Sequence, residues 1–95
     1  MIYLNVLLKV KDPADVELIR SLLTEQGQLS RAEPGCLRFE VYHSNADPLR
    51  FVLNECWESQ AAIDVHRTAQ AYTTIYQPKV LPLVDREGHP SQLLE

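Results

Sequence analysis

The sequence predicts an α+β fold in which the elements follow the order β-α-β-β-α-β. Three segments, 2–11, 36–43 and 50–57, alternate apolar and polar residues, which is typical of strands with one buried face. Stretches with apolar residues at helical spacing follow the first and third segments. This order is the ferredoxin-like arrangement, which we expect as an antiparallel sheet with helices on one face. Ninety-five residues suffice for one compact core, so we expect a single domain over residues 1–95.

The first strand and the first helix follow from local patterns. The strand has a strongly apolar face made of Ile2, Leu4, Val6, Leu8 and Val10. Asp12-Pro13 then supplies an N-cap followed by a proline suited to the start of a helix. Apolar residues recur at near-helical spacing until Glu33-Pro34-Gly35, which predicts a helix over roughly 13–32.

The next two segments predict an antiparallel hairpin. Residues 44–48 form a Ser-Asn-Ala-Asp-Pro stretch, which favours a turn between the strands. We expect odd residues to pair with odd ones, because this register joins the two apolar faces. The joined face would contain Leu37, Phe39, Val41, His43, Phe51, Leu53, Glu55 and Trp57. We expect the helices to cover it.

The last third of the chain gives weaker signals. Ser59 is expected to cap a second helix. Pro78 and Pro82 each remove a backbone donor and clash with the preceding turn, so we expect a break near Gln77. A final strand within 86–94 is only weakly indicated, because a glycine and a proline interrupt that segment.

Charge and composition exclude several classes of function. Nine basic against thirteen acidic residues give a net charge of −4, the wrong sign for a surface that binds nucleic acid through phosphates. No apolar run approaches the length of a membrane span, and no cationic leader precedes the first strand. We therefore expect a cytoplasmic protein with neither a nucleic-acid nor a membrane partner.

The cysteines do not predict a metal site. Cys36 and Cys56 have neither metal-site spacing nor a CxxC arrangement, and no other zinc ligand set is evident. The two would be near one another if their strands pair, so a cross-strand disulfide is an alternative. We expect free thiols, because a chain without an export signal normally stays in a reducing compartment.

Three stretches resemble the antibiotic biosynthesis monooxygenase domain of the dimeric α+β barrel class. They are Glu33 to Phe39, Asp47 to Glu58, and Ala62 through His66 to Tyr72. The resemblance implies a homodimer whose two sheets form a barrel, with a small-molecule pocket between sheet and helices in each subunit. It also implies chemistry without a cofactor, since several branches oxidise aromatic polyketides or quinols with molecular oxygen alone.

Individual positions separate the branches of this family. Haem-degrading relatives have an asparagine, a tryptophan and a histidine where this chain has Val6, His66 and Tyr76, so haem is disfavoured. Anthrone-oxidising relatives have an asparagine and a tyrosine where this chain has Leu53 and Ile63. The pattern is more similar to the quinol monooxygenase and signalling-sugar isomerase branches. Both commonly have a histidine where this chain has Ala71.

Glu55 and His66 are the expected catalytic residues. A carboxylate on the helix-facing side of a strand needs a partner, and His66 is the nearest candidate. Glu55 would then orient the imidazole, which could take a proton from a phenolic or enediol substrate near neutral pH. The alternative is a purely structural pair that ties helix to sheet.

Aromatic and apolar residues around this pair are expected to bind substrate. Trp57 could form a flat wall or belong to the core, and Tyr72 and Tyr76, one turn apart, could supply hydroxyl donors. Phe39 and Leu53 would complete an apolar floor. His43 is more typical of an exposed strand end than of a ligand contact.

Three functions follow as hypotheses. The first is a cofactor-independent monooxygenase acting on a small electron-rich aromatic or quinol. The second is a cofactor-free isomerase of a small sugar-like metabolite, for which Arg67, Lys79 and Arg86 are the only nearby cations. The third is a non-catalytic dimeric module that binds a small molecule.

Overall fold

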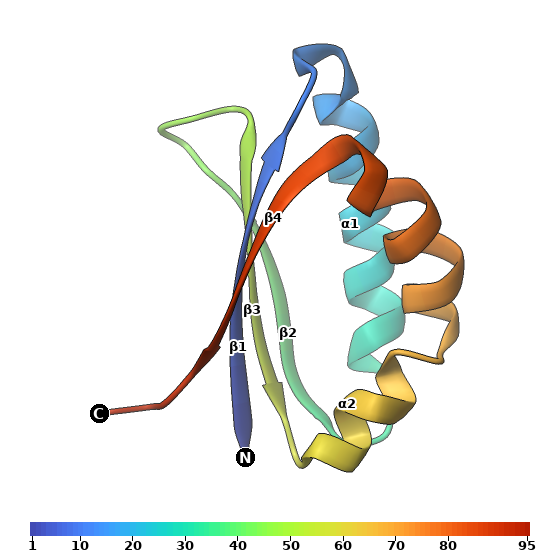
Figure 1. Cartoon of the computed structure of the whole chain (residues 1–95), viewed down its shortest axis with the longest axis vertical. Coiled ribbons are helices and arrows are strands. Elements are labelled where there is room, and N and C mark those ends of the chain that lie inside the picture. Colours follow the sequence, from blue (N-terminus) through green and yellow to red (C-terminus); the bar gives the residue numbers. More distant parts are fainter.

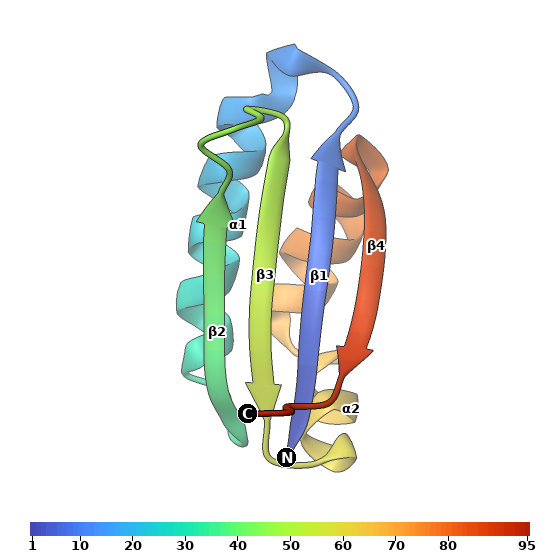
Figure 2. The ribbon, with the colours of Figure 1, turned by 90° about the vertical axis from the view of Figure 1, so that its left-hand side faces the viewer.

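The computed structural model describes all 95 residues and confirms the predicted fold class. Four strands form one antiparallel sheet in the order β2-β3-β1-β4, and every helix lies on the same face of it (Figures 1 and 2). The strands are β1 (Ile2–Val10), β2 (Cys36–His43), β3 (Arg50–Trp57) and β4 (Val84–Ser91). The helical elements are η1 (Pro13–Asp15), α1 (Val16–Arg31), α2 (Gln60–His66), η2 (Ala71–Val80) and η3 (Leu81–Leu83). No helix is long and apolar enough to cross a membrane.

The hairpin has the predicted register over most of its length. Phe39 lies opposite Glu55, and Val41 lies opposite Leu53. A bulge between Cys36 and Arg38 shifts the pairing at the start of β2. The prediction for Leu37 was therefore wrong, because the extra residue leaves its side chain 55% exposed.

The core lies between the sheet and the helices. Val6, Leu8 and Val10 of β1 contribute to it, as do Ile19 and Leu23 of α1, and all five are at most 1% exposed. These residues follow the period of two in the strand and the spacing of four in the helix that the sequence shows. The opposite face of the sheet has no helix over it (Figure 1).

The second helical region is interrupted earlier than predicted. The break expected near Gln77 is instead a turn at residues 67–70, and η2 is a continuous π-helix that contains Pro78. Thr68 contributes to the early break, because both its backbone N–H and its hydroxyl donate to the carbonyl of Val65. The wider turn of a π-helix accommodates Pro78, since its hydrogen bonds run to the fifth residue back.

The weakly indicated final strand is present. β4 pairs with β1 from Val84 to Ser91, and it forms an edge of the sheet, where a strand tolerates Pro90. Figure 2 shows β4 beside β1, with the chain end crossing in front of the lower part of β1 toward β3. This strand brings Arg86 against the helical layer, where its Nε donates to the hydroxyl of Tyr76 over 2.9 Å.

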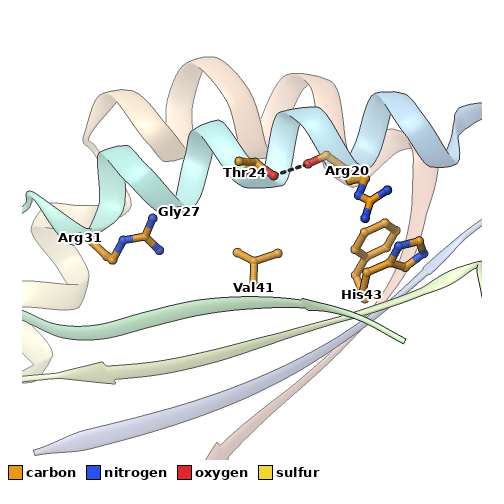
Figure 3. Close-up of a pocket in the computed structure, with 7 residues that line it drawn as sticks. Arg20, Thr24, Gly27, Arg31, Val41 and His43 are labelled. Carbon is orange, nitrogen blue, oxygen red and sulfur yellow. Dashed lines mark hydrogen bonds between the residues drawn. The ribbon is translucent and has the colours of Figure 1, made fainter. Parts of the chain in front are cut away.

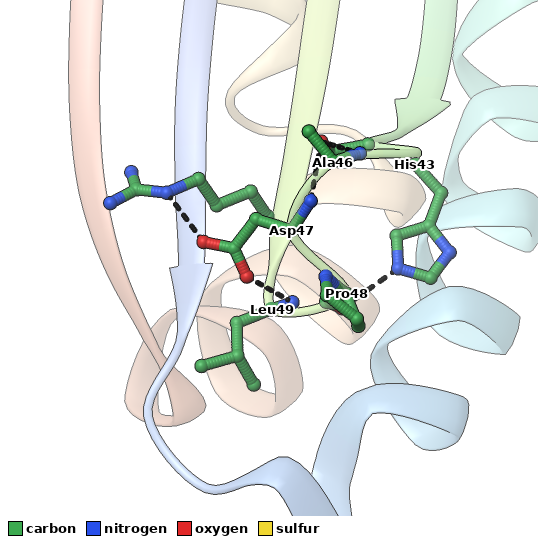
Figure 4. Close-up of polar contacts among 7 residues, drawn as sticks. His43, Ala46, Asp47, Pro48 and Leu49 are labelled. Atoms are coloured by element: carbon green, nitrogen blue, oxygen red, sulfur yellow. Dashed lines mark hydrogen bonds and ion pairs between the residues drawn. The ribbon is translucent and has the colours of Figure 1, made fainter.

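The turn between β2 and β3 is fixed by side-chain hydrogen bonds (Figure 4). Asp47 accepts from the backbone N–H of Leu49 and from Nε of Arg50, and the first of these bonds is the main cause that lowers the pKa of this carboxyl. His43 bonds through Nε2 to the carbonyl of Pro48 and stacks on Phe51, with ring centroids 4.2 Å apart. The turn therefore occupies His43 structurally, away from Glu55 and His66.

Gly35 fixes the approach of the β2 start to α2. Its φ is +82°, a left-handed conformation, and a Cβ built on it would lie 2.5 Å from Cβ of Ala62. Its carbonyl also accepts from the N–H of Glu58 over 2.8 Å. The turn that contains Glu33 can therefore lie close to α2 only with glycine at this position.

We expect Gly35→Ala to destabilise the domain by at least about 1–2 kcal/mol, because an L-residue is strained at this φ and the new methyl group meets Ala62. Chemical denaturation of the single variants and of the double variant with Ala62→Gly would separate the two causes. The double variant should recover the stability that is lost through the contact with Ala62, but not the stability that is lost through strain of the backbone. Equal stability of Gly35→Ala and the unmodified protein would contradict the assignment.

Candidate functional site

The buried ionisable residues of the helix-sheet interface converge on one small cavity. Glu55 is 7% exposed and His66 is 6% exposed, although both are polar. The cavity is lined by Leu4, Gln26, Glu55, Ile63, His66, Arg67, Tyr72, Tyr76 and Arg86. Four predicted site residues, Glu55, His66, Tyr72 and Tyr76, thus lie together. They come from β3, α2 and η2.

His66 has a carboxylate partner that the sequence analysis did not identify. Its Nδ1 lies 2.7 Å from Oε1 of Glu33, and the two side chains are only 7% and 13% exposed. The expected hydrogen bond between Glu55 and His66 was therefore wrong. A carboxylate oxygen accepts hydrogen bonds, so Nδ1 of His66 donates to Glu33 and Nε2 is the ring nitrogen outside this contact.

Glu55 is held by the indole of Trp57 instead. Nε1 of Trp57 donates to Oε1 of Glu55 over 3.0 Å, two residues along the same face of β3. Burial raises the pKa of Glu55 above its ordinary value, while the Trp57 hydrogen bond and the charges of His66, Arg86 and Arg67 oppose this rise. Glu55 is thus a carboxyl group whose neutral form is favoured by its surroundings and which can hold a proton inside the cavity.

Aromatic rings pack around His66 on both sides. The centroid of the imidazole lies 4.4 Å from that of Trp57 and 5.8 Å from that of Tyr72, and Tyr72 is followed by Tyr76 at 5.5 Å. Burial also raises the pKa of Tyr76. These contacts, together with the hydrogen bond that His66 donates to Glu33, restrict the ring of His66 to one orientation.

Three residues expected to bind substrate lie in the core instead of the cavity wall. Trp57, Phe39 and Leu53 are each at most 1% exposed and belong to the cluster of buried apolar side chains. Phe39 packs edge-on against Trp57, with centroids 6.4 Å apart. The strand alternation correctly predicts that they face the helices, but the helices cover them completely.

Gln26 lines the cavity and was missed by the sequence analysis. It is 1% exposed, and its carboxamide oxygen has no hydrogen-bond partner in the protein. A buried unpaired acceptor costs roughly 1–3 kcal/mol. A signal for it exists, because Gln26 and Ser30 continue the helical stripe of Ile19 and Leu23.

Arg67 and Arg86 are also part of the cavity wall. Arg67 is the C-cap residue of α2, and Arg86 reaches the cavity from β4. Both belong to the small set of nearby cations that the sequence indicates, whereas Lys79, the third, does not line the cavity. Neither arginine forms a salt bridge in the structure, in which the ion pairs involve Arg20, Arg38 and Arg50 and two histidines.

The cavity is a small recess, partly open to solvent, with a volume of about 30 Å³. That space corresponds to about one water molecule, whereas a cavity that binds benzene measures about 150 Å³. A ring-sized ligand therefore requires movement of side chains at the wall. Arg67, which is exposed, and Tyr72, which is half-buried, are the wall residues with the most freedom to move.

A larger groove of about 290 Å³ lies elsewhere, between α1 and the edge strand β2 (Figure 3). Arg20, Thr24 and Arg31 line it from the helix, and Val41 and His43 line it from the strand. It contains no buried ionisable pair, and Arg31 already donates to the carbonyl of Phe39 over 2.8 Å. We therefore place the candidate site at the smaller cavity, where acid, base and unpaired acceptor meet.

Comparison with known proteins identifies the family of this chain. A family model described as antibiotic biosynthesis monooxygenase matches residues 1–77. The chain belongs to the antibiotic biosynthesis monooxygenase family. A search of the curated proteins finds no match.

Solved structures show the same fold along the whole length of this family member. An antibiotic biosynthesis monooxygenase of 22% identity superposes with a TM-score of 0.85, covering 98% of this chain and 99% of the other. PA3566 from Pseudomonas aeruginosa, at 20% identity, gives 0.86 and covers 99% and 95%. Rv0793 from Mycobacterium tuberculosis, at 26% identity, gives 0.82 and covers 100% and 98%.

The two cysteine thiols of the protein do not line the cavity. Cys36 faces Trp57 and Cys56 faces Arg38 across the hairpin, and both are free. Burial, followed by the nearby carboxylates of Glu33 and Glu55, raises the pKa of Cys36 to about 11. A thiol with this pKa is a poor nucleophile at neutral pH. No group of three or more His, Cys, Asp or Glu side chains is placed to hold a metal ion.

We expect the free energy of unfolding of Glu55→Gln, relative to that of the unmodified protein, to increase as pH rises above about 4.5, the ordinary pKa of this carboxyl. The folded state binds the proton more tightly than the unfolded state, so the stabilisation from the protonated form is lost as pH passes the raised folded pKa. The slope is at most about 1.4 kcal/mol per pH unit for one proton. Urea unfolding between pH 4 and 8 measures it.

The matched control for that experiment is Glu25→Gln, which removes an exposed carboxylate from α1. It should show little change of relative stability over the same range. If the difference between Glu55→Gln and the unmodified protein were constant with pH, the raised pKa of Glu55 would be disproved.

Proposed function

We propose that this protein is a monooxygenase that acts without a cofactor on a small electron-rich hydroxyaromatic or quinol-type molecule. The observation that carries the proposal is the buried His66, whose Nδ1 is bound to Glu33 while the ring borders the cavity. Family membership supports oxygen chemistry in general, and the residues of the cavity support the proton transfer.

His66 is the proposed base. Its Nε2 removes a proton from a substrate hydroxyl, and the carboxylate of Glu33 stabilises the imidazolium that forms. The resulting phenolate is electron-rich enough to transfer an electron to molecular oxygen. For a quinol, one oxygen atom enters the ring, the other leaves as water, and the substrate supplies all the electrons as it becomes a hydroxyquinone. Glu55 is proposed to hold and return a proton during these steps, because its neutral form is favoured by burial.

The small size of the site and its buried polar groups support this chemistry. The cavity holds about one water molecule, and Glu55 and His66 beside it are buried, so a substrate that enters replaces most of the solvent around these two groups. Trp57, Phe39 and Leu53 contribute to the reaction only by packing beneath this site, in our proposal.

An isomerase that moves a proton between carbons is the second candidate. The observation in its favour is that Arg67 and Arg86 line the cavity without salt-bridge partners, which suits an anionic metabolite. The same His66 and Glu55 would then remove and return the proton. Turnover that continues in the absence of oxygen would distinguish this function.

We also propose a homodimer formed through the bare face of the sheet. This face exposes Leu7 by 38% and Tyr42 by 52%. A chain of hydrogen bonds orders its polar residues, because Asn54 donates to Asn5, which donates to Ser91. An ordered, partly apolar sheet face without a helix over it is suited to burial against a second copy.

We expect His66→Ala to reduce oxygen consumption by roughly 10²–10⁴-fold, the typical contribution of a positioned base. An oxygen electrode with a panel of quinols measures this, and analysis of products formed under nitrogen detects oxygen-independent turnover. Glu33→Gln should lower kcat less than His66→Ala does, because the base remains but the imidazolium loses its counter-charge. His43→Ala, at the distant turn, is the control and should keep full activity. Full activity of His66→Ala would reject the proposed base.

For the dimer, we expect Leu7→Glu to convert it to a monomer, because the substitution places a charge within the buried sheet face. Light scattering after size-exclusion chromatography measures the mass. Leu18→Glu on α1 is the control, since Leu18 is 49% exposed on the opposite side of the domain. A monomeric unmodified protein at micromolar concentration would exclude the dimer.

A further inference from the structure

Gln26 occupies a position where a polar side chain has no role within the protein alone. It lies on the buried stripe of α1 with Ile19 and Leu23, and its carboxamide oxygen is both buried and unpaired. An apolar side chain of similar size would fill the space without leaving an acceptor unsatisfied. The oxygen is therefore free to accept a hydrogen bond from a molecule that enters the cavity.

The cavity supplies the place for that donor. Gln26 lines it together with Glu55 and His66, the two groups proposed to move protons. Ser30 gives an internal comparison, because its hydroxyl oxygen is also buried and unpaired on the same stripe, but Ser30 does not line the cavity. Only the acceptor of Gln26 can meet a ligand.

Positive charge lies on the same cavity wall. Nε of Arg86 donates to the Tyr76 hydroxyl, but its guanidinium forms no salt bridge, and the side chain of Arg67 has neither a hydrogen-bond nor a salt-bridge partner. Two unpaired guanidinium groups at one site are suited to a carboxylate or phosphate, which they can bind in bidentate geometry.

We propose that the ligand of this cavity is a small hydroxylated acid. A hydroxyl group of the ligand donates to the carboxamide oxygen of Gln26, and its anionic group lies against Arg67 and Arg86. This assignment rests on the proposed function, since it places the hydroxyl beside His66, and it narrows the substrate to an anion. The small volume of the cavity restricts the ligand to one ring or a short chain, admitted by movement of Tyr72 and Arg67.

Binding measurements test the assignment without any need for turnover. Isothermal titration with 2,5-dihydroxybenzoate, benzoate, hydroquinone and glycerol 3-phosphate separates the hydroxyl, the carboxylate and the phosphate. We expect one hydroxylated anion, either the dihydroxybenzoate or the glycerol phosphate, to bind at least tenfold more tightly than benzoate and hydroquinone. Which of these two compounds binds shows whether the anionic group recognised is a carboxylate on an aromatic ring or a phosphate on a polyol. Absence of binding by all four compounds at millimolar concentration would overturn the proposal.

Two substitutions assign the groups. Gln26→Leu should weaken binding of the hydroxylated anion about tenfold and leave benzoate unchanged, because only the hydroxyl loses its acceptor. Arg86→Met should weaken the binding of both the hydroxylated anion and benzoate, and leave the binding of hydroquinone unchanged. Ser30→Ala is the matched control and should alter none of them. Unchanged affinity of Gln26→Leu for the hydroxylated anion would overturn the role of Gln26.

The outcomes separate this inference from the proposed function. Hydroxylated anions that bind as described but consume no oxygen would keep the ligand class and reject the monooxygenase. Oxygen consumption with neutral quinols that is unaffected by Gln26→Leu and Arg86→Met would support the monooxygenase and reject the hydroxylated acid as the ligand. Gln26→Leu removes an unpaired buried acceptor, so circular dichroism should show a folded variant, and Gln26→Met provides a second apolar substitution of similar length.

Discussion

The contact between Glu33 and His66 is the interaction on which the site depends. It joins the turn after α1 to the end of α2, two segments 33 residues apart in the chain. A carboxylate and an imidazole buried to this degree stabilise one another only if the geometry is maintained, because either group alone would be left without a partner in an apolar environment. The packing of α2 on the sheet and the left-handed turn at Gly35 maintain that geometry.

The same contact divides the proton chemistry between two glutamates. Glu33 accepts a hydrogen bond from Nδ1 of His66 and so fixes which ring nitrogen is directed away from this contact. Glu55 is bound to the neutral indole of Trp57, and burial favours its protonated form. Titratable groups whose environments differ in this way are typical of sites that use one group as a base and another as an acid.

Much of the fold follows from the sequence, because strand alternation and the helical stripe are strong local signals. The helix-facing position of Glu55 also follows, since it depends only on the period of two in β3. The bulge at Leu37 does not, because one extra residue in a strand leaves no local signature. The early end of α2 was missed for a similar reason. A hydroxyl that competes for a backbone carbonyl, as Thr68 does, is a weaker signal than a proline.

The site was predictable only in part, because its geometry depends on contacts between distant segments. Glu33 belongs to a Glu-Pro-Gly turn, so the sequence indicates the end of a helix and gives no reason to pair it with His66. Gln26 is an ordinary surface residue by composition, and only its position on the stripe of Ile19 and Leu23 shows that it is buried. Arg86 depends on β4, the least certain element, for its place at the cavity. Glu33, Gln26 and Arg86 therefore take their places at the site through contacts between distant segments. The local pattern of each segment indicates at most its element and its buried face, so it does not show which side chains from different elements meet.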